Sequence, residues 1–359
     1  MEKLKKSLTS FAVPILSILL AFVIGAIIML VLGANPMEAL KYLFVGAFGS
    51  AANLGTTLVK STPLIFTGLC ACFAYKCGVF NLGGEGQFII GSVAAFYVAY
   101  CSGVTGLPGI LLSLLAAILA GALWGLIPGV LKITRGQNEM IISIMLNYVA
   151  TLFMGVVYTN WMRDAAVPQT PSVPDATKIA RVIPNMRFTW GFVVAILIGI
   201  AIYYFLYWTS GGFKLRAVGL NMTASRFSGF PIRRFIMISF LISGAIAGLG
   251  GGAELLGTQY RLINGFGAGY GFDGVAIALI GQLHPLATIV VAIFFAALRA
   301  GSTTMQAAAG VPTSVSDIIQ ALVIVFSVAG MALTKLPEFE ALRLRLSDRF
   351  SRKKEVQDV

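Results

Sequence analysis

The feature that most constrains this fold is a series of long apolar runs separated by short polar stretches. The first extends from Phe11 to Leu32, which is enough for a helix to cross a bilayer core. Of the 359 residues, 58% are hydrophobic and only 11% are charged, whereas a soluble chain of this length carries about 25% charged residues. The sequence therefore predicts an all-α, polytopic integral membrane protein.

We expect about ten transmembrane helices, with both termini in the cytoplasm. The predicted spans cover residues 11–32, 61–77, 87–101, 109–131, 140–158, 188–208, 236–256, 272–283, 286–299 and 316–333. The eighth is short for a membrane helix and ends at His284-Pro285. Counting it as a crossing places most of the 26 Lys and Arg residues on the cytoplasmic side. Residues 1–333 would then form one transmembrane domain, followed by a charged cytoplasmic tail over 334–359.

The two halves of the chain resemble each other weakly. The segment Asn81–Gly86 before the third span is similar to Gly271–Gly274 before the eighth. Five crossings separate the two segments, and because this number is odd, the expectation is two inverted repeats with a substrate path between them. Chance similarity is the alternative. In the seventh span, Gly244, Gly248 and Gly252 recur every four residues and predict close helix packing.

Two carboxylates, Glu85 and Asp273, stand among glycines at the ends of apolar runs. An ionisable group at such a place either lines a polar path or caps a helix, and both alternatives stay open here. Nearby amides can bond to polar groups of a cargo, and nearby aromatic rings can cover a flat ring. The predicted substrate-path residues are Asn81, Glu85, Gln87, Phe88, Phe272 and Asp273.

No chemistry-bearing constellation is visible in the sequence. The four cysteines lie in or beside apolar runs and are expected to be structural. There is no nucleophile–base set, no metal-ligand spacing and no phosphate-binding Gly-x-x-x-x-Gly-Lys-Ser/Thr loop. We therefore expect no catalytic residue, metal or cofactor. The net charge of +12 comes from loops between spans rather than one basic domain, so a nucleic-acid partner is not expected.

The longest polar segment between apolar runs is Gly211–Phe235. It carries Lys214, Arg216, Arg226, Arg233 and Arg234 and has no acidic residue. Residues 217–228 are predicted to form one short helix, ended by the glycine and proline that follow. A helix on a basic cytoplasmic loop suits docking to a soluble partner, and the alternative is an ordinary solvated loop.

Three stretches carry a family resemblance: Phe80–Gln87 (FNLGGEGQ), Arg216–Gly229 (RAVGLNMTASRFSG) and Ser243–Gly248 (SGAIAG). They resemble permease subunits of bacterial ABC importers of the branched-chain amino acid/ribose type. The pattern from Asn35 to Gln87 is most similar to the nucleoside-importing branch of this family. The resemblance implies a multi-pass protein of the bacterial cell membrane that imports nucleosides and is not itself an enzyme. It also implies a separate ABC ATPase, a second homologous permease subunit and an extracytoplasmic substrate-binding lipoprotein.

The same resemblance identifies the second stretch as the segment that docks on the ATPase. The residues it assigns to coupling are Arg216, Gly219, Asn221, Ala224, Arg226 and Gly229. Two alternatives stay open at this point. One is an ABC permease for a sugar, a flavin or another small polar ring compound. The other is a stand-alone secondary transporter that would use Glu85, Asp273 or Asp317 as proton or ion sites.

Overall fold

A computed structural model describes residues 2–164, 167–183 and 186–333 of the chain. The predicted cytoplasmic tail, 334–359, lies outside these described residues. The regular elements of the described part are helices, and its only strand-like pairing is an isolated bridge between Arg181 and Thr189. The prediction of an all-α fold is confirmed.

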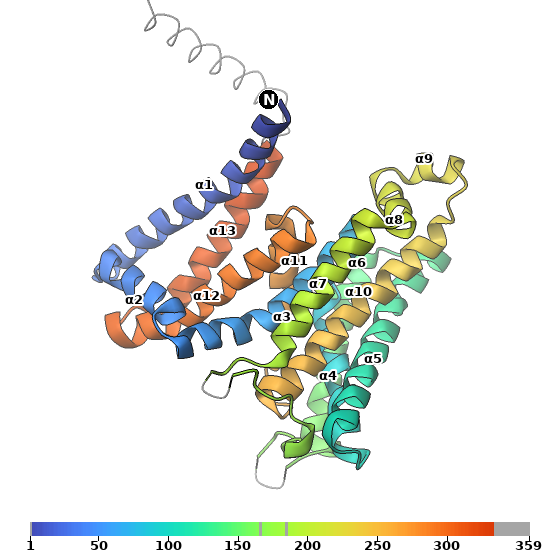
Figure 1. Ribbon diagram of the computed structural model, residues 1–359, viewed down its shortest axis with the longest axis horizontal. Helices are drawn as coiled ribbons and strands as arrows, with labels where there is room; N and C mark the ends of the chain where they lie inside the picture. Colours follow the sequence, from blue (N-terminus) through green and yellow to red (C-terminus); the bar gives the residue numbers. More distant parts are fainter. Residues whose placement is uncertain (1, 165–166, 184–185, 334–359) are drawn as a thin grey trace, which may run out of the picture. The chain divides into compact units, whose positions relative to one another are not determined.

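The described residues divide into two units, each with its own internal packing: 2–40 with 305–333, and those between 41 and 304. We call them the terminal unit and the central unit. In the terminal unit, α1 (Glu2–Val31) and α13 (Thr313–Leu333) lie side by side (Figure 1). Gly25 allows this approach, because an added Cβ would stand 2.6 Å from the Ile319 side chain. Helix α2 (Pro36–Phe48) follows α1.

The central unit is built around α3 (Ala51–Lys76), which is almost wholly buried. The helices packed against it are α7 (Trp190–Trp208), α10 (Ile232–Glu254) and α11 (Tyr270–Ile280). Its amino end is capped by Ser50, whose hydroxyl accepts a hydrogen bond from the Asn53 amide at 3.1 Å. Around this core stand α4 (Gly84–Cys101), α5 (Gly106–Arg135), α6 (Glu139–Val156) and α12 (Pro285–Ala309).

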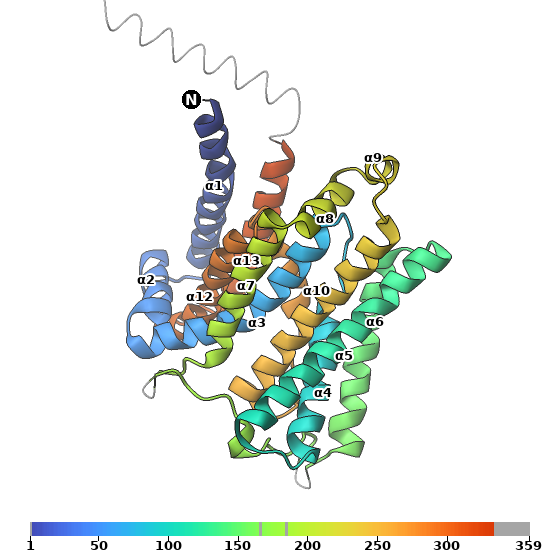
Figure 2. The same cartoon turned by 45° about the vertical axis from the view of Figure 1, so that its right-hand side comes forward.

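Helices α5 and α10 touch backbone to backbone (Figure 2). A Cβ added to Gly121 would lie 2.4 Å from the Gly244 carbonyl oxygen, and one added to Gly248 would lie 2.3 Å from the Ala117 carbonyl oxygen. Small residues permit this contact, and they are the usual means of close helix packing in membranes. The predicted glycine face of the seventh span is confirmed.

Seven helices in the described part of the chain are long and apolar enough to cross a membrane. They cover Ala51–Lys76, Gly106–Arg135, Glu139–Trp161, Trp190–Trp208, Ile232–Gln259, Pro285–Ala309 and Thr313–Gly330. Ile15–Val31 and Tyr270–Ile280 are shorter apolar helices. The protein is therefore a multi-pass membrane protein by the length and composition of its helices.

Two predicted span boundaries were wrong. Helix α3 begins at Ala51 rather than Ser61, and α12 continues beyond Arg299 to Ala309. Polar residues do not end these helices, because their side chains find partners inside the protein. The Thr57 hydroxyl donates to the Ala47 carbonyl at 2.9 Å, and Lys60 Nζ donates to the Arg299 carbonyl at 3.1 Å.

The prediction of one helix over residues 217–228 was also wrong. The basic segment forms two helices, α8 (Ser210–Leu220) and α9 (Met222–Phe227). Between them, Asn221 adopts an extended conformation with φ −156°, and its side-chain oxygen accepts from the Ala224 amide at 2.9 Å. Asparagine is a preferred N-cap residue, so it ends one helix and starts the next.

Candidate functional site

The first turns of α4 and α11 lie against each other in the central unit. A Cβ added to Gly271 would stand 2.4 Å from the backbone nitrogen of Glu85, so no side chain fits at that position. Glu85 Oε2 accepts a hydrogen bond from the Gly269 amide at 3.1 Å. The carboxylate of one helix thus caps the amino end of the other, where unpaired N–H groups and the helix dipole favour a negative charge.

These two helices run in opposite directions. Helix α4 is parallel to α10, because residue numbers rise together along their contacts, from Gly91–Gly248 to Ala95–Gly252. Helix α11 is parallel to α3 for the same reason, with contacts that run from Thr67–Gly274 to Cys72–Ala278. Helices α3 and α10 are antiparallel, since their contacts run in opposite order: Phe66–Gly250 and Cys70–Ser243. The amino ends of α4 and α11 therefore meet from opposite sides.

The two predicted path amides, Asn81 and Gln87, bind each other. Asn81 Nδ2 donates to Gln87 Oε1 at 3.1 Å, and Gln87 Nε2 donates to Asn81 Oδ1 at 3.0 Å. Asn81 also donates to the Ser243 hydroxyl at 2.8 Å, and each amide side chain is only 1% exposed. In this conformation both amides hold α4 against α10 rather than facing a cavity.

A third amide, Asn147 of α6, completes this network and was not singled out from the sequence. Its Oδ1 accepts from the Gly86 amide at 2.8 Å, and its Nδ2 donates to the Leu82 carbonyl at 2.9 Å. Irregular backbone in a membrane needs such internal partners. The signal that could have found Asn147 is a lone amide within an otherwise apolar span.

An aromatic cluster covers the junction of α4 and α11. The ring centre of Phe88 lies 6.0 Å from that of Phe266 and 5.7 Å from that of Tyr270. Phe88 is fully buried and Phe266 is 4% exposed. Phe272, by contrast, is 49% exposed and stands outside the cluster. Of the two predicted rings, the structure therefore brings only Phe88 to the junction.

Asp273 binds α12 through an ion pair with Arg299. The two side chains are 24% and 29% exposed, so the pair is mostly withdrawn from solvent. The guanidinium carbon of Arg299 also lies 5.6 Å from the ring centre of Tyr270, within reach of a cation–π contact. Asp273 thus links the start of α11 to α12 and to the aromatic cluster.

The predicted coupling residues lie on α8, on α9 and just beyond them. Gly219 of α8 is pressed against the end of α3, where an added Cβ would stand 2.2 Å from the Lys76 carbonyl oxygen. Gly229 follows α9 in a left-handed conformation with φ +77°, but its surroundings are open. The two glycines therefore serve different purposes: close approach at one, a backbone turn at the other.

The ring of Tyr207, near the end of α7, connects several elements. The Arg216 guanidinium carbon lies 4.7 Å from the ring centre, Lys76 Nζ lies 5.9 Å from it, and the His284 ring lies 5.5 Å away. Burial and the nearby Lys76 lower the pKa of His284, so its ring is uncharged at neutral pH. Tyr207 thus joins α8 to the end of α3 and to the turn between α11 and α12.

That turn is conformationally unusual. Gln282 and Leu283 both adopt left-handed backbone angles, with φ of 54° and 55°. Residues other than glycine pay a cost in this region and keep it only where the surroundings impose it. The turn between α11 and α12 therefore holds strain next to the contacts of Tyr207.

Helix α9 protrudes at one end of the central unit (Figure 1), and most of its side chains are exposed, although Ser225 is buried. Asn221, Ala224 and Arg226 are exposed, and Arg226 forms no ion pair within the described residues. Leu220 and Phe227 are 88% and 90% exposed. Two protruding apolar side chains beside an unpaired arginine form a surface suited to a protein partner.

Comparison with known proteins places this geometry in context. Residues 53–328 match the family described as branched-chain amino acid transport system, permease component. The chain is 35% identical over 334 residues to the guanosine ABC transporter permease protein NupP of Bacillus subtilis, covering 91% of this chain and 96% of that protein. It is 33% identical over 329 residues to the glucose ABC transporter permease protein TsgB13 of Haloferax volcanii, covering 88% and 87%. It is 31% identical over 349 residues to the nucleoside ABC transporter permease protein NupB of Lactococcus lactis, covering 92% and 94%.

Proposed function

Because the chain belongs to the family of branched-chain amino acid transport system permease components, we propose that it imports nucleosides as the membrane-spanning subunit of an ABC importer. The observation that carries the nucleoside assignment is identity of 35% and 31% to guanosine and nucleoside permeases over nearly their whole lengths. As a permease, the chain is a translocation subunit rather than an enzyme. ATP hydrolysis belongs to a separate subunit.

Uptake measurements test the cargo. Cells that produce the permease with its ATPase, partner permease and binding protein should accumulate radiolabelled guanosine, and cells without the permease should not. A sugar is the second candidate, because a glucose permease is 33% identical over most of the chain. Unlabelled adenosine in excess should therefore compete with guanosine, while excess glucose should not. Competition by glucose alone would move the assignment to sugars.

We place the substrate path beside the junction of α4 and α11. Two helices that begin within the membrane and meet amino end to amino end are typical of binding regions between inverted repeats. The opposed directions of α4 and α11, and the matched carboxylates Glu85 and Asp273, support two such repeats. Counting α1, α4 and α11 with the seven long spans supports ten helices in the membrane. In this conformation Phe88 closes the junction, so opening would require the aromatic cluster to separate.

Transmission from the ATPase follows from the contacts of α8. The ATPase would dock on the end of α8 and on α9, through Leu220, Arg226 and Phe227. Its movement would displace α8, which is pressed on the end of α3 at Gly219 and stacked on Tyr207 through Arg216. Through the ring of Tyr207, the displacement would reach the strained turn that starts α12. A second homologous permease and an extracytoplasmic binding lipoprotein would complete the importer.

We further propose that the termini and the α8–α9 segment face the cytoplasm of the bacterial cell. Ser228→Cys, made in a chain whose native cysteines are replaced, should resist an impermeant thiol reagent in intact cells and react after the cells are opened. Ser102→Cys is the matched control. Ser102 is also exposed and directly follows the last residue of α4, which the proposed orientation places outside the cell, so this variant should react in intact cells. Labelling of Ser228→Cys from outside would reverse the proposed orientation.

A further inference from the structure

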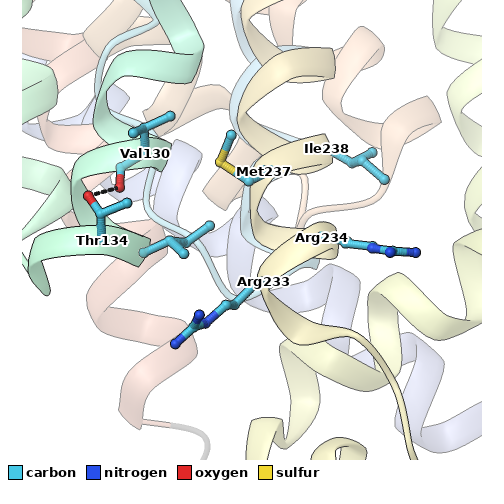
Figure 3. A pocket seen from close by; sticks show the side chains of 7 residues that line it. Val130, Thr134, Arg233, Arg234, Met237 and Ile238 are labelled. Atoms are coloured by element: carbon cyan, nitrogen blue, oxygen red, sulfur yellow. Dashed lines mark hydrogen bonds between the residues drawn. The ribbon is translucent and has the colours of Figure 1, made fainter.

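A groove of about 380 Å³ lies between the last turns of α5 and the first turns of α10 (Figure 3). Its lining residues are Val130, Ile133, Thr134, Arg233, Arg234, Met237 and Ile238. The Thr134 hydroxyl is occupied, because it donates to the Val130 carbonyl at 2.7 Å, as the dashed line in Figure 3 shows. The walls are therefore hydrocarbon. The Arg233 and Arg234 side chains extend from α10 in different directions, with Arg233 on the side of α5 (Figure 3).

The two arginines are placed where a cation is costly. They stand in the first turn of α10, whose partial positive charge repels them. Both are exposed, and neither takes part in the ion pairs of the described residues. The surrounding segment Gly211–Phe235 contains no acidic residue. Within the described residues, no acidic side chain compensates the charge of these two arginines.

We propose that this groove binds an anionic phospholipid of the leaflet next to the α8–α9 segment. Arg233, which extends on the side of α5 (Figure 3), would bind the headgroup phosphate, because a guanidinium offers several N–H donors that match phosphate oxygens. Arg234, on the same turn of α10, would add positive charge nearby. One acyl chain would follow the apolar side chains of Val130, Ile133 and Met237. Basic pockets between membrane helices at the cytoplasmic side are known places for anionic headgroups. The bound phosphate would also neutralise the first turn of α10.

The combination of walls and charges selects a lipid over other anions. A free phosphate or a nucleotide gains nothing from a hydrocarbon wall, whereas an acyl chain fits one. A zwitterionic lipid fits the wall but leaves the arginines without net charge compensation. The site should therefore prefer phosphatidylglycerol to phosphatidylcholine.

Native mass spectrometry of the full-length permease in detergent tests this preference. When each lipid is added at increasing concentration, the wild type should retain phosphatidylglycerol at a lower lipid concentration than it needs to retain phosphatidylcholine. The double variant Arg233→Gln/Arg234→Gln should bind phosphatidylglycerol about 30-fold more weakly, given the usual contribution of a basic residue at a membrane surface. Arg135→Gln is the matched control, since Arg135 is an exposed arginine that ends α5 without lining the groove. It should bind as the wild type does.

A second variant separates the wall from the charge. Val130→Trp fills the groove but keeps both arginines, and it should weaken phosphatidylglycerol retention while leaving the melting temperature in detergent unchanged. A photoactivatable phosphatidylglycerol should cross-link to the lining residues, and excess inorganic phosphate should not prevent it. Unchanged lipid retention in the double variant, equal binding of phosphatidylcholine, or displacement by phosphate would overturn the proposal. The proposal would also be overturned if the double variant no longer copurified with the ATPase but bound lipid as the wild type does, because the groove would then be a protein-docking surface.

Discussion

Gly219→Ala is expected to lower ATP-driven uptake at least tenfold. The added methyl group would stand 2.2 Å from the Lys76 carbonyl oxygen and 2.9 Å from the Gly78 nitrogen, and both are backbone atoms that cannot rotate away. Helix α8 must therefore move off the end of α3. Overpacking of this kind typically costs about 1–3 kcal/mol, which displaces one contact without unfolding the membrane domain.

The matched control is Gly229→Asn. Gly229 has a left-handed backbone but open space around it, and asparagine tolerates that conformation better than other residues with a Cβ. Its uptake should stay within about fivefold of wild type, since backbone strain of about 1 kcal/mol corresponds to a factor of about five. Both variants should copurify with the ATPase. Nucleoside-dependent ATP hydrolysis should be lost only in Gly219→Ala, and normal uptake by that variant would contradict the role given to α8.

Asp273→Asn and Arg299→Gln should each reduce uptake more than the double variant that carries both changes. Either single change leaves one member of a mostly buried ion pair without its partner. Removing one partner of a fully buried pair costs about 3–5 kcal/mol, and the residual exposure here reduces this to about 2 kcal/mol. The double variant removes both charges, so less uncompensated charge remains. Labelled guanosine uptake and thermal unfolding in detergent, measured at equal protein amounts, complete the double-mutant cycle.

Glu85→Gln serves as the comparison. Glu85 accepts from a backbone amide at the start of α11, and the carbonyl oxygen of glutamine can accept the same bond. The free energy of unfolding should therefore fall by only about 1 kcal/mol in Glu85→Gln, which is less than in Asp273→Asn. If the two single variants and the double variant behave alike, then Asp273 and Arg299 do not act as a pair, and Asp273 must contribute in another way.

Much of the architecture could be predicted from hydrophobicity alone. Lipid-facing helices such as α5 and α7 must be apolar over their whole length, so their bounds are visible in the sequence. Helix α3 is different, because it is surrounded by protein and tolerates Thr57 and Lys60 wherever a carbonyl can accept from them. Hydrophobicity therefore gave the wrong start for the most buried helix.

The candidate site was less predictable, because its interactions join residues far apart in the chain. Glycines and a carboxylate marked the break before α4, but not the bond from Gly269 to Glu85, which spans much of the sequence. The amides Asn81 and Gln87 were recognised as polar groups in a membrane, yet the sequence does not show that they satisfy each other. No sequence pattern predicted the contacts of Tyr207, since a tyrosine at the end of a membrane helix is an ordinary interfacial residue.

The glycine contacts between α5 and α10 have a mechanical consequence. Where side chains separate two helices, a change of rotamer lets one helix slide past the other. At Gly121, Gly244 and Gly248 the backbones themselves touch, and no rotamer exists to absorb a displacement. We therefore expect α5 and α10 to move as one rigid body, so that a displacement at the end next to α8 and α9 also moves the far end. The conformational change that transport requires would then take place in the segments before and after α11.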